Sequence, residues 1–463
     1  MGIDDLEPSM TEGGPGNTRR PPRSRVWRAG LNLAALVLGL AICEAALHAA
    51  VALSPRVAFH LRPYYLKLNV DGNEVAGTRE LVPDPVLGYR FSPYSTRFDS
   101  WGYRNSTVPT ACDIVALGDS MTFGHDVLAH QSWPFVLSQL HGCCVYNAGV
   151  GGYGPAEYQV VLSETLALRP KIVVVGLYLG NDMQDAFRTT YLPYLRAGDP
   201  FKHLRNIDPA IVLRVTQLEQ HESLRQQTLR LLGLGTETAA PAAPGKGMRF
   251  WLAEHSKLYA FARELRRALR VAWNSARGDH AWLPGEQSVE TFDTSAAKPY
   301  RFGWSRIENL RTVFVKPEVV EVSIRQGDPR IEEGERITGA VLGAMRQRLA
   351  IDNVHLVVLV IPTKESAYAE LVDPQRDGLP ASTTNLIATE TRLRERIVGF
   401  LRQAQITYVD ALPALRGSLA NGTMAYNESD DGHPNAAGQR AMALALLPTI
   451  RDRLATSVAL SKD

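Results

Sequence analysis

Three observations predict that this chain is an α/β protein built around a parallel sheet. Five short, strongly apolar segments have the length and β-branched composition of buried strands. Segments with helical apolar spacing separate them, as in the βαβ units of a parallel sheet covered by helices on both faces. The alternation is interrupted once, between residues 186 and 345, by a mainly helical pattern. The sequence therefore predicts one α/β domain split by a helical insertion.

The overall composition excludes several classes of protein. The chain has 463 residues, of which 45% are hydrophobic and 21% charged, as in globular rather than disordered proteins. Its 50 basic and 48 acidic residues leave a net charge of +2, which argues against a nucleic-acid partner. Four cysteines are too few for a disulfide framework. The sequence identifies no protein partner.

The N-terminus has the pattern of a membrane anchor. Residues 1–28 are predicted to be a disordered cytoplasmic tail, and residues 29–53 are almost wholly apolar and just long enough to span a bilayer core of about 30 Å. Arginines before this segment predict that it crosses the inner membrane with the N-terminus in the cytoplasm and everything after it in the periplasm or another extracytoplasmic space. The alternative is a cleaved signal peptide, because Ala50-Val51-Ala52 has the small-x-small pattern of a cleavage site.

One acidic residue and one histidine interrupt the apolar segment. Glu44 and His48 lie four residues apart and therefore on one helical face. They can pair with each other, face a partner helix, or lie near the outer membrane interface.

The rest of the chain gives the predicted elements in order. An extended lead over residues 54–110 is expected to pack on the main domain, whose two halves are residues 111–185 and 346–456. The insertion 186–345 is too long for a plain loop and is predicted to be an ordered lobe or lid. The predicted strands are 114–117, 143–146, 172–177, 354–361 and 406–409, and the main predicted helices are 155–168, 211–232, 249–273, 385–404 and 435–454.

Four of these strands are followed by residues that can do chemistry. In open parallel α/β sheets, active sites form at the carboxyl ends of the strands. Ser120, after the first strand, is a candidate nucleophile or a simple helix cap. The glycine-rich loop around Gly152, after the second, can offer backbone amides to a ligand or be an ordinary turn. Asn181, after the third, can donate to an oxyanion or form an Asx turn, and His433, after the fifth, can be a general base or structural.

The four stretches, in this order, resemble the sequence blocks of the SGNH (GDSL-type) hydrolase superfamily. Ser120 matches the first block in Gly-Asp-Ser-Met, Gly152 the second in NAGVGGYG, Asn181 the third in Leu-Gly-Asn-Asp and His433 the fourth in DDGHPN. The resemblance covers residues 113–182 and 354–454. It implies a flavodoxin-like sheet of five parallel strands, ester or acyl chemistry, and no metal or other cofactor.

A second, looser resemblance is to exported, membrane-anchored SGNH proteins related to alginate O-acetylation factors. It is carried by the segment Ile361-Pro362-Thr363-Lys364-Glu365 together with the predicted membrane helix, and it covers no catalytic group.

These residues predict a serine mechanism. His433 is expected to take the proton of Ser120, and Asp430, three residues before the histidine, is expected to orient the imidazole, with Asp431 facing solvent. The backbone N–H groups of Ser120 and Gly152 and the side chain of Asn181 are expected to form the oxyanion hole. Asp119 and Asp182 are expected to cap or support these groups.

The predicted function is that of a membrane-anchored, extracytoplasmic serine esterase acting on acyl esters, acetyl esters foremost, with a glycan as one candidate carrier. An O-acyltransferase that moves acetyl groups to a cell-surface polysaccharide would use the same acyl-serine. A non-catalytic glycan-binding assembly subunit with the same fold is the third reading, and the intact serine, histidine and aspartate argue against it.

Cysteines and aromatic residues support weaker expectations. Adjacent parallel strands can bring Cys112 near Cys143 or Cys144, so a disulfide is expected, with buried free thiols as the alternative. Several aromatic residues could stack on sugar rings, although packing in the core is the commoner role for such side chains. They are Trp133, Tyr153, Tyr178, Trp251, Trp273, Trp282 and Trp304.

Overall fold

The computed structural model describes most of the chain. The residues described are 23–62, 66–70, 73–77, 80–95, 97–192, 199–231, 248–276, 301–307, 310–315, 317–372, 381–427 and 431–460. Two compact units are present, one formed by residues 1–62 together with 251–266 and the other by the remainder of the chain.

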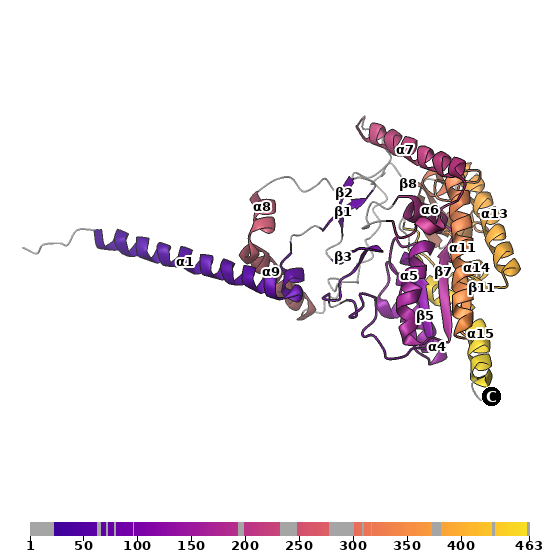
Figure 1. The fold of residues 1–463 in the computed structure, drawn as a ribbon, viewed down its shortest axis with the longest axis horizontal. Helices are drawn as coiled ribbons and strands as arrows, with labels where there is room; N and C mark the ends of the chain where they lie inside the picture. Colours follow the sequence, from indigo (N-terminus) through magenta and orange to yellow (C-terminus); the bar gives the residue numbers. More distant parts are fainter. Residues whose placement is uncertain are drawn as a thin grey trace, which may run out of the picture. The chain divides into compact units, whose positions relative to one another are not determined.

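A five-stranded parallel sheet forms the centre of the larger unit (Figure 1). Its strand order is β11-β10-β7-β5-β6, so the first strand of the domain, β5, lies between β6 and β7. All five strands predicted from the sequence are confirmed, with ends shifted by one or two residues. The strands are β5 (Ile114–Gly118), β6 (Val145–Asn147), β7 (Ile172–Tyr178), β10 (His355–Ile361) and β11 (Thr407–Asp410).

Helices cover both faces of this sheet, because alternate strand residues point to opposite sides. One face packs against α5 (Pro155–Thr165), α6 (Asp182–Tyr191), α11 (Pro329–Ile351) and α13 (Ser382–Gln403). The other packs against α4 (Trp133–His141), α14 (Leu412–Ala420) and α15 (Ala436–Leu460). In β5, Val115 and Leu117 belong to the first core and Ile114 and Ala116 to the second.

The second half of the main domain begins earlier in the sequence than predicted, with helix α11. The predicted insertion ends at residue 345, which falls inside α11, and this helix buries Ile337, Val341 and Leu349 in the core on the sheet. A helix with nine buried residues over six turns is part of the sheet's cover rather than of a separate lobe.

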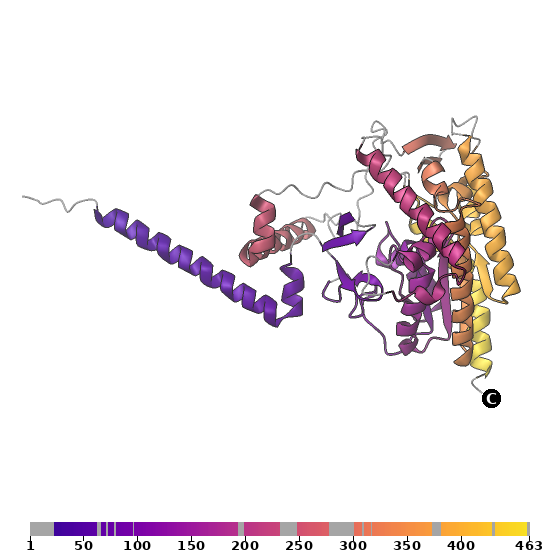
Figure 2. The ribbon, with the colours of Figure 1, turned by 45° about the horizontal axis from the view of Figure 1, so that its top comes forward.

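The remaining elements of the insertion are mostly helical. They are η3 (Lys202–Leu204), α7 (Pro209–Leu231), α8 (Met248–His255), α9 (Lys257–Ala276), the antiparallel pair β8 (Arg301–Ile307) and β9 (Leu310–Val315), and α10 (Pro317–Glu321). Both long helices predicted here are present, the second as the pair α8 and α9. The view in Figure 2 shows α7 as one uninterrupted helix. Trp282 lies outside the described residues.

The predicted lead contains short strands. Its elements are β1 (Leu66–Val70), β2 (Asn73–Gly77), β3 (Leu81–Asp84) and β4 (Gly88–Phe91), which form two antiparallel pairs. Arg90 of β4 bonds to Asp84 at 2.6 Å and to Glu164 of α5 at 2.8 Å, which attaches this hairpin to the main domain. Short helical turns complete the larger unit: α3 (Ser120–Phe123), η1 (Ala129–Gln131), η2 (Leu166–Leu168) and α12 (Lys364–Tyr368).

The smaller unit contains the apolar N-terminal helix. Helix α1 (Arg23–Leu53) is followed by α2 (Pro55–His60), where Ser54 accepts a hydrogen bond from the Val57 N–H as the helix cap. The part Trp27–Leu53 is long and apolar enough to cross a membrane, as a signal sequence or an anchor would be. The helix begins at Arg23, so the end of the predicted disordered tail is helical, and residues 1–22 lie outside the description.

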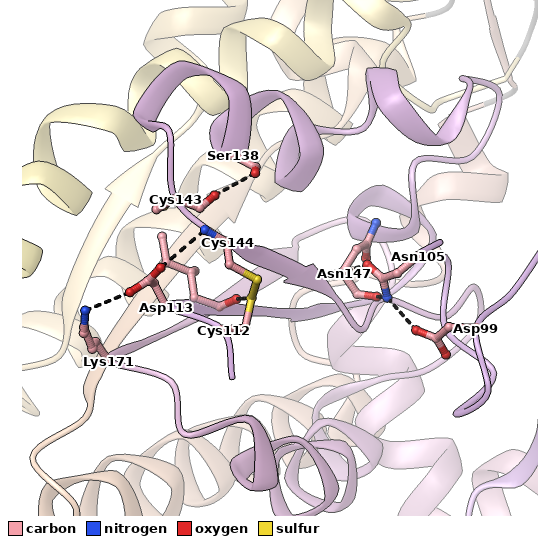
Figure 3. The surroundings of a disulfide bond; sticks show 10 residues. Asp99, Asn105, Cys112, Asp113, Ser138, Cys143, Cys144, Asn147 and Lys171 are labelled. Carbon is pink, nitrogen blue, oxygen red and sulfur yellow. Dashed lines mark hydrogen bonds and ion pairs between the residues drawn. A yellow bond between two sulfur atoms is a disulfide. The ribbon is translucent and has the colours of Figure 1, made fainter. Parts of the chain in front are cut away.

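A disulfide joins the starts of two neighbouring strands (Figure 3). Cys112 is bonded to Cys144, with the Cα atoms 5.0 Å apart, while Cys143 and Cys43 are free. Asp113, next to Cys112, accepts from the Cys144 N–H at 3.3 Å and from Lys171 at 2.8 Å. The expected pairing of Cys112 with one of two neighbouring cysteines is thereby resolved in favour of Cys144.

Candidate active site

A hydrogen-bonded row of three side chains lies at the carboxyl edge of the sheet. The Nε2 atom of His433 lies 2.8 Å from the Ser120 hydroxyl oxygen, and its Nδ1 atom lies 2.5 Å from an Asp431 carboxylate oxygen. Ser120 follows β5, whereas the other two residues lie in the loop before α15. Residues that are 313 positions apart in the sequence therefore meet within hydrogen-bond distance.

Ser120 lies on a sharp turn between strand β5 and helix α3, and the residues around it explain how this turn forms. Gly118 has a φ of +153°, and a Cβ atom there would lie 2.2 Å from the Thr122 hydroxyl oxygen, so the turn requires glycine. Asp119 caps α3 by accepting from the Met121 N–H at 2.9 Å. The predicted capping role of Asp119 is confirmed, and Ser120 is left half-buried at the first position of the short helix.

The carboxylate that the structure places against the histidine belongs to Asp431. Asp430 lies outside the described residues, and the expectation that Asp431 faces solvent is wrong. The same Asp431 oxygen that meets the ring also accepts from the His433 backbone N–H at 2.8 Å. This local turn brings a carboxylate two residues before the histidine back onto the imidazole. The sequence spacing predicts instead that a carboxylate three residues before the histidine makes this contact.

These contacts fix which ring nitrogen carries the proton. Because the Asp431 carboxylate can only accept, Nδ1 donates to it, and Nε2 is left with a lone pair facing the Ser120 hydroxyl. Burial opposes protonation of His433, but the hydrogen bond and charge of Asp431 outweigh it and raise the His433 pKa above its usual 6.5. Burial alone would raise the pKa of Asp431, yet its bond to His433 holds that pKa well below the usual range. The carboxylate is therefore ionised wherever the histidine titrates.

The glycine loop after β6 passes directly over Ser120. A Cβ atom on Gly151 would lie 3.7 Å from the Ser120 Cβ, and the Val150 N–H bonds to the Gly118 carbonyl at 3.0 Å. Gly152 has a φ of +80°. Among the described residues, the N–H groups of Ser120 and Gly152 have no hydrogen-bond partner, so both remain available to a bound group.

A tyrosine from the lead holds this loop in place. Tyr89 of β4 donates to the Gly151 carbonyl at 2.8 Å and receives a hydrogen bond from Tyr153 on its own carbonyl. A Cβ atom on Gly152 would lie 2.5 Å from the Tyr89 hydroxyl oxygen, so only glycine fits here. The sequence argument missed Tyr89, because nothing in the pattern of residues 54–110 connects it to the loop.

Asn181 also lies at the carboxyl edge of the sheet, where Ser120 lies. It lies just past β7, which pairs with β5, and begins α6 without capping it through its side chain. Its side-chain oxygen is buried and has no hydrogen-bond partner among the described residues. Asp182, next to it, accepts from the Tyr178 N–H and the Tyr158 hydroxyl, both at 2.9 Å, and so supports the turn. The structure thus does not use the Asn181 amide for folding.

Two further titratable residues surround the histidine. The rings of His125 and His433 lie 4.5 Å apart, and Asp126 lies 3.4 Å from His125 and shares a hydrogen bond with Asp431. Burial and the neighbouring Asp431 raise the pKa of Asp126 to about 7, whereas that of Asp431 is lowered, so Asp126 is the first of the two carboxylates to take up a proton on acidification. Neither residue was singled out from the sequence.

These four side chains also have the chemistry of metal ligands. One nitrogen or oxygen from each of His125, Asp126, Asp431 and His433 lies within 4.8 Å of the others. Both His433 nitrogens and the facing Asp431 oxygen are, however, engaged in the row with Ser120. The geometry fits a network that holds and moves a proton better than a cation site.

A buried arginine fixes the loop that carries His125 and Asp126. Arg104 donates to the carbonyls of Phe123 at 3.1 Å, Gly124 at 2.5 Å and Val127 at 2.7 Å. Burial lowers the pKa of Arg104 to about 10, which still leaves it charged at neutral pH. The lead therefore contributes a second support to the site.

A buried lysine fixes the loop that carries Asp431 and His433. Lys364, at the start of α12 after β10, is 1% exposed and donates to the carbonyl of Asn427 at 3.0 Å, with the Asp431 carbonyl at 3.5 Å. Glu390 of α13 accepts from the Thr363 N–H at 2.8 Å and from the Ser366 hydroxyl, and so anchors the lysine's own turn. The Pro-Thr-Lys sequence directly after a buried strand was the only signal for this residue.

The aromatic residues considered for stacking divide into two groups. Trp133 and Tyr153 are buried, which confirms the packing role, whereas Trp251 and Trp273 are exposed on α8 and α9. Tyr178 lies beside the site, since a Cβ atom on Gly432 would be 3.7 Å from its hydroxyl oxygen.

Comparisons with known proteins give structural likeness only. No family model matches the chain, and no curated protein matches it. Among solved structures, an acetylxylan esterase from Geobacillus stearothermophilus has 11% identity over 74% of this chain and 95% of its own, with a TM-score of 0.31. A GDSL-like lipase from Bacteroides thetaiotaomicron has 10% identity over 73% and 88%, with a TM-score of 0.27. LAE5, an α/β hydrolase enzyme from the metagenome of Lake Arreo, has 12% identity over 74% and 96%, with a TM-score of 0.29.

Likeness at these identities and TM-scores carries no conclusion about activity or substrate, which must rest on the side chains of this chain. The chain is an α/β protein with a five-stranded parallel sheet and a long apolar N-terminal helix, and it is similar in structure to GDSL-type lipases and acetylxylan esterases.

Proposed function

We propose that this protein is a serine esterase that acts on acyl esters through an acyl-serine intermediate, with Ser120, His433 and Asp431 as its catalytic residues. The observation that carries the proposal is the row in which His433 contacts Ser120 at 2.8 Å and Asp431 at 2.5 Å. A serine hydroxyl is a poor nucleophile at neutral pH and needs a base at this distance. A protein that only binds glycans has no need for the three groups in this arrangement.

The proposed chemistry has two halves. His433 takes the Ser120 proton as the hydroxyl oxygen attacks the ester carbonyl, and Asp431 stabilises the imidazolium that forms. The proton then passes to the leaving alcohol, and a water molecule, activated by the same histidine, releases the acid. The N–H groups of Ser120 and Gly152 and the Asn181 amide are proposed to stabilise the negative oxygen of each tetrahedral intermediate.

We propose that the protein works outside the cytoplasm, anchored by α1. The apolar stretch Trp27–Leu53 supports an anchor, and arginines on its N-terminal side favour a cytoplasmic N-terminus. The Cys112–Cys144 disulfide supports an oxidising compartment for the larger unit. We propose acyl esters, acetyl esters foremost, as the substrate class, with a cell-surface glycan as one candidate carrier.

The proposal is tested by trapping the acyl-serine and by following acetate release. A fluorophosphonate probe should attach to Ser120, as located by mass spectrometry, and the protein should release acetate from acetylated glycans and from a soluble acetyl ester. Failure of both would reject the esterase. Acyl transfer that rises with added unacetylated glycan, at the expense of free acetate, would instead identify the O-acyltransferase.

Removing the Asn181 amide is expected to weaken the oxyanion hole. Asn181→Ala should lower kcat by about 10²–10³-fold with little change in KM, because the lost donor acts mainly in the transition state. Steady-state kinetics on the soluble ester measures this, with the exposed Asn421→Ala as the matched control. A higher KM with an unchanged kcat would assign Asn181 to substrate binding instead.

The pH dependence should follow His433. A general base works only when neutral, and the pKa of His433 lies above 6.5, so kcat/KM should fall on acidification with its half-maximal point above pH 6.5. Asp431→Asn should move this limb to lower pH, because the carboxylate is what raises the pKa. Pre-incubation at each pH followed by assay at neutral pH separates titration from unfolding. A half-maximal point of kcat/KM below pH 6 in the unaltered protein would contradict the contact between Asp431 and His433.

Loss of the Lys364 ammonium should displace the loop of Asp431 and His433. Lys364→Met keeps most of the side chain's volume but removes the donor to Asn427, and a displacement of about 1 Å should lower kcat/KM by about 10²-fold. Lys171→Met, which breaks a surface pair with Asp113, is the matched control. Equal activities of the two variants would show that the lysine does not position the loop.

A further inference from the structure

An acidic residue of the apolar helix caps another helix from far along the chain. Glu44 of α1 accepts hydrogen bonds from the Ser256 hydroxyl at 3.0 Å, the Lys257 N–H at 2.6 Å and the Leu258 N–H at 2.8 Å. These three donors are the cap and the first turn of α9. Glu44 and residues 256–258 all belong to the smaller unit.

The capping explains a residue that the apolar pattern leaves unexplained. A carboxylate within a membrane segment is costly unless it is paired. Here two backbone N–H groups, one hydroxyl and His48, at 3.1 Å, surround it. Cleavage after Ala52 would remove this contact.

The position of Glu44 along α1 sets the level of α9. Glu44 lies 16 residues after Arg28, the last of the basic residues, which is about 24 Å along the helix. The hydrocarbon core is about 30 Å thick, so a helix with Arg28 at the cytoplasmic boundary places Glu44 near the outer boundary. The start of α9 then lies at the same level.

Helix α9 has the two faces of an interfacial helix. Phe261, Leu265 and Leu269, which form an apolar stripe, recur every four residues and are 46–62% exposed. Ala260, on a different side of the helix, is buried, and Arg263 donates to the Arg62 carbonyl at 3.1 Å. Among the described residues, Phe261 and Leu265 therefore lie on another side of the helix than these two contacts.

The charges of α9 favour lipid as the partner of this stripe. The helix carries five basic residues and one acidic residue. Among them, Arg266 and Arg270 are exposed. At 3.6 residues per turn, Arg270 lies on the side of the helix opposite Leu265, and Arg266 lies at the edge of the stripe. Aromatic and leucine side chains on one face and arginines on the other are typical of helices that lie in the interface of an anionic bilayer.

We propose that α1 is retained in the mature protein and that Glu44 holds the start of α9 at the outer surface of the membrane, where Phe261 and Leu265 enter the lipid and Arg270 meets anionic headgroups. The inference rests on the proposed anchoring by α1 and is independent of the proposed chemistry. It gives the anchor a second contact with the bilayer.

The test uses the full-length protein in lipid nanodiscs containing phosphatidylglycerol. In a Cys43→Ala, Cys143→Ala background, which leaves the Cys112–Cys144 disulfide intact, a fluorophore is attached through Leu265→Cys or, as the matched control on the opposite side of the helix, Arg270→Cys. Doxyl-labelled lipid should quench the first label several-fold more than the second, and aqueous iodide should do the reverse. Glu44→Leu should abolish the difference between the two positions.

Several outcomes would overturn the inference. Equal quenching of both labels by lipid would mean that α9 does not lie in the interface, and shielding of Leu265→Cys from both quenchers would mean that protein covers the stripe. Unchanged quenching in Glu44→Leu would remove the role of Glu44. A mature N-terminus after Ala52, found by intact mass, would contradict retention of α1.

Two controls separate this inference from the proposed anchor and the proposed activity. Release of the protein from membranes by alkaline carbonate would show that the anchor itself is absent. Turnover of the soluble acetyl ester should be unchanged in all labelled variants, because none of the substituted residues contacts the site, and a loss there would indicate misfolding.

Discussion

Replacement of Ser120 by alanine is expected to lower kcat/KM for a soluble acetyl ester by on the order of 10⁴–10⁶-fold. The substitution removes the only oxygen that His433 contacts at 2.8 Å and on which an acyl group can be carried. Labelling by the fluorophosphonate probe should disappear with the activity. The residual rate would come from the N–H donors and substrate binding alone.

Folding of the Ser120→Ala protein has to be checked independently. The side chain is half-buried and does not cap α3, since that role belongs to Asp119, so the thermal unfolding midpoint should stay close to that of the unaltered protein. Ser163→Ala, on the exposed side of α5, is the matched serine control and should retain full activity. Activity that survives in Ser120→Ala would exclude the acyl-serine mechanism.

The two neighbouring aspartates should behave very differently. Asp431→Asn is expected to reduce kcat by about 10⁴-fold, because an amide in place of the carboxylate no longer holds the proton on Nδ1 and Nε2 can no longer accept from Ser120. Asp430→Asn removes the carboxylate that the sequence spacing favoured, and its effect should remain within a few-fold. Kinetics of both variants on the same ester makes the comparison direct.

The comparison of these aspartates also decides between two geometries of the loop. A large loss in Asp430→Asn with a small one in Asp431→Asn would mean that the three-residue spacing operates in the working enzyme. Losses of similar size would mean that both carboxylates support the histidine. Only a large loss in Asp431→Asn together with a small one in Asp430→Asn agrees with the 2.5 Å contact between Asp431 and Nδ1 of His433.

Local sequence was sufficient for the elements that repeat a simple physical pattern. The five strands are continuous apolar runs because both faces of a parallel sheet are buried, and such runs are visible without any knowledge of the fold. Ser120, Gly152, Asn181 and His433 could be selected because each follows a strand or lies in a short motif. The apolar length of residues 29–53 likewise indicated a membrane segment.

Contacts between distant segments could be decided only by the tertiary structure. Whether Asp430 or Asp431 meets the imidazole depends on the turn of one loop, and that turn is held by Lys364, which is more than 60 residues away. Tyr89 and Arg104 support the site from a lead whose sequence shows no periodic pattern. Glu44 finds its partners more than 200 residues later, at the start of α9. Sequence spacing reports which residues share a strand or a helix face, whereas the partner of a buried polar group is selected by the packing of the whole chain.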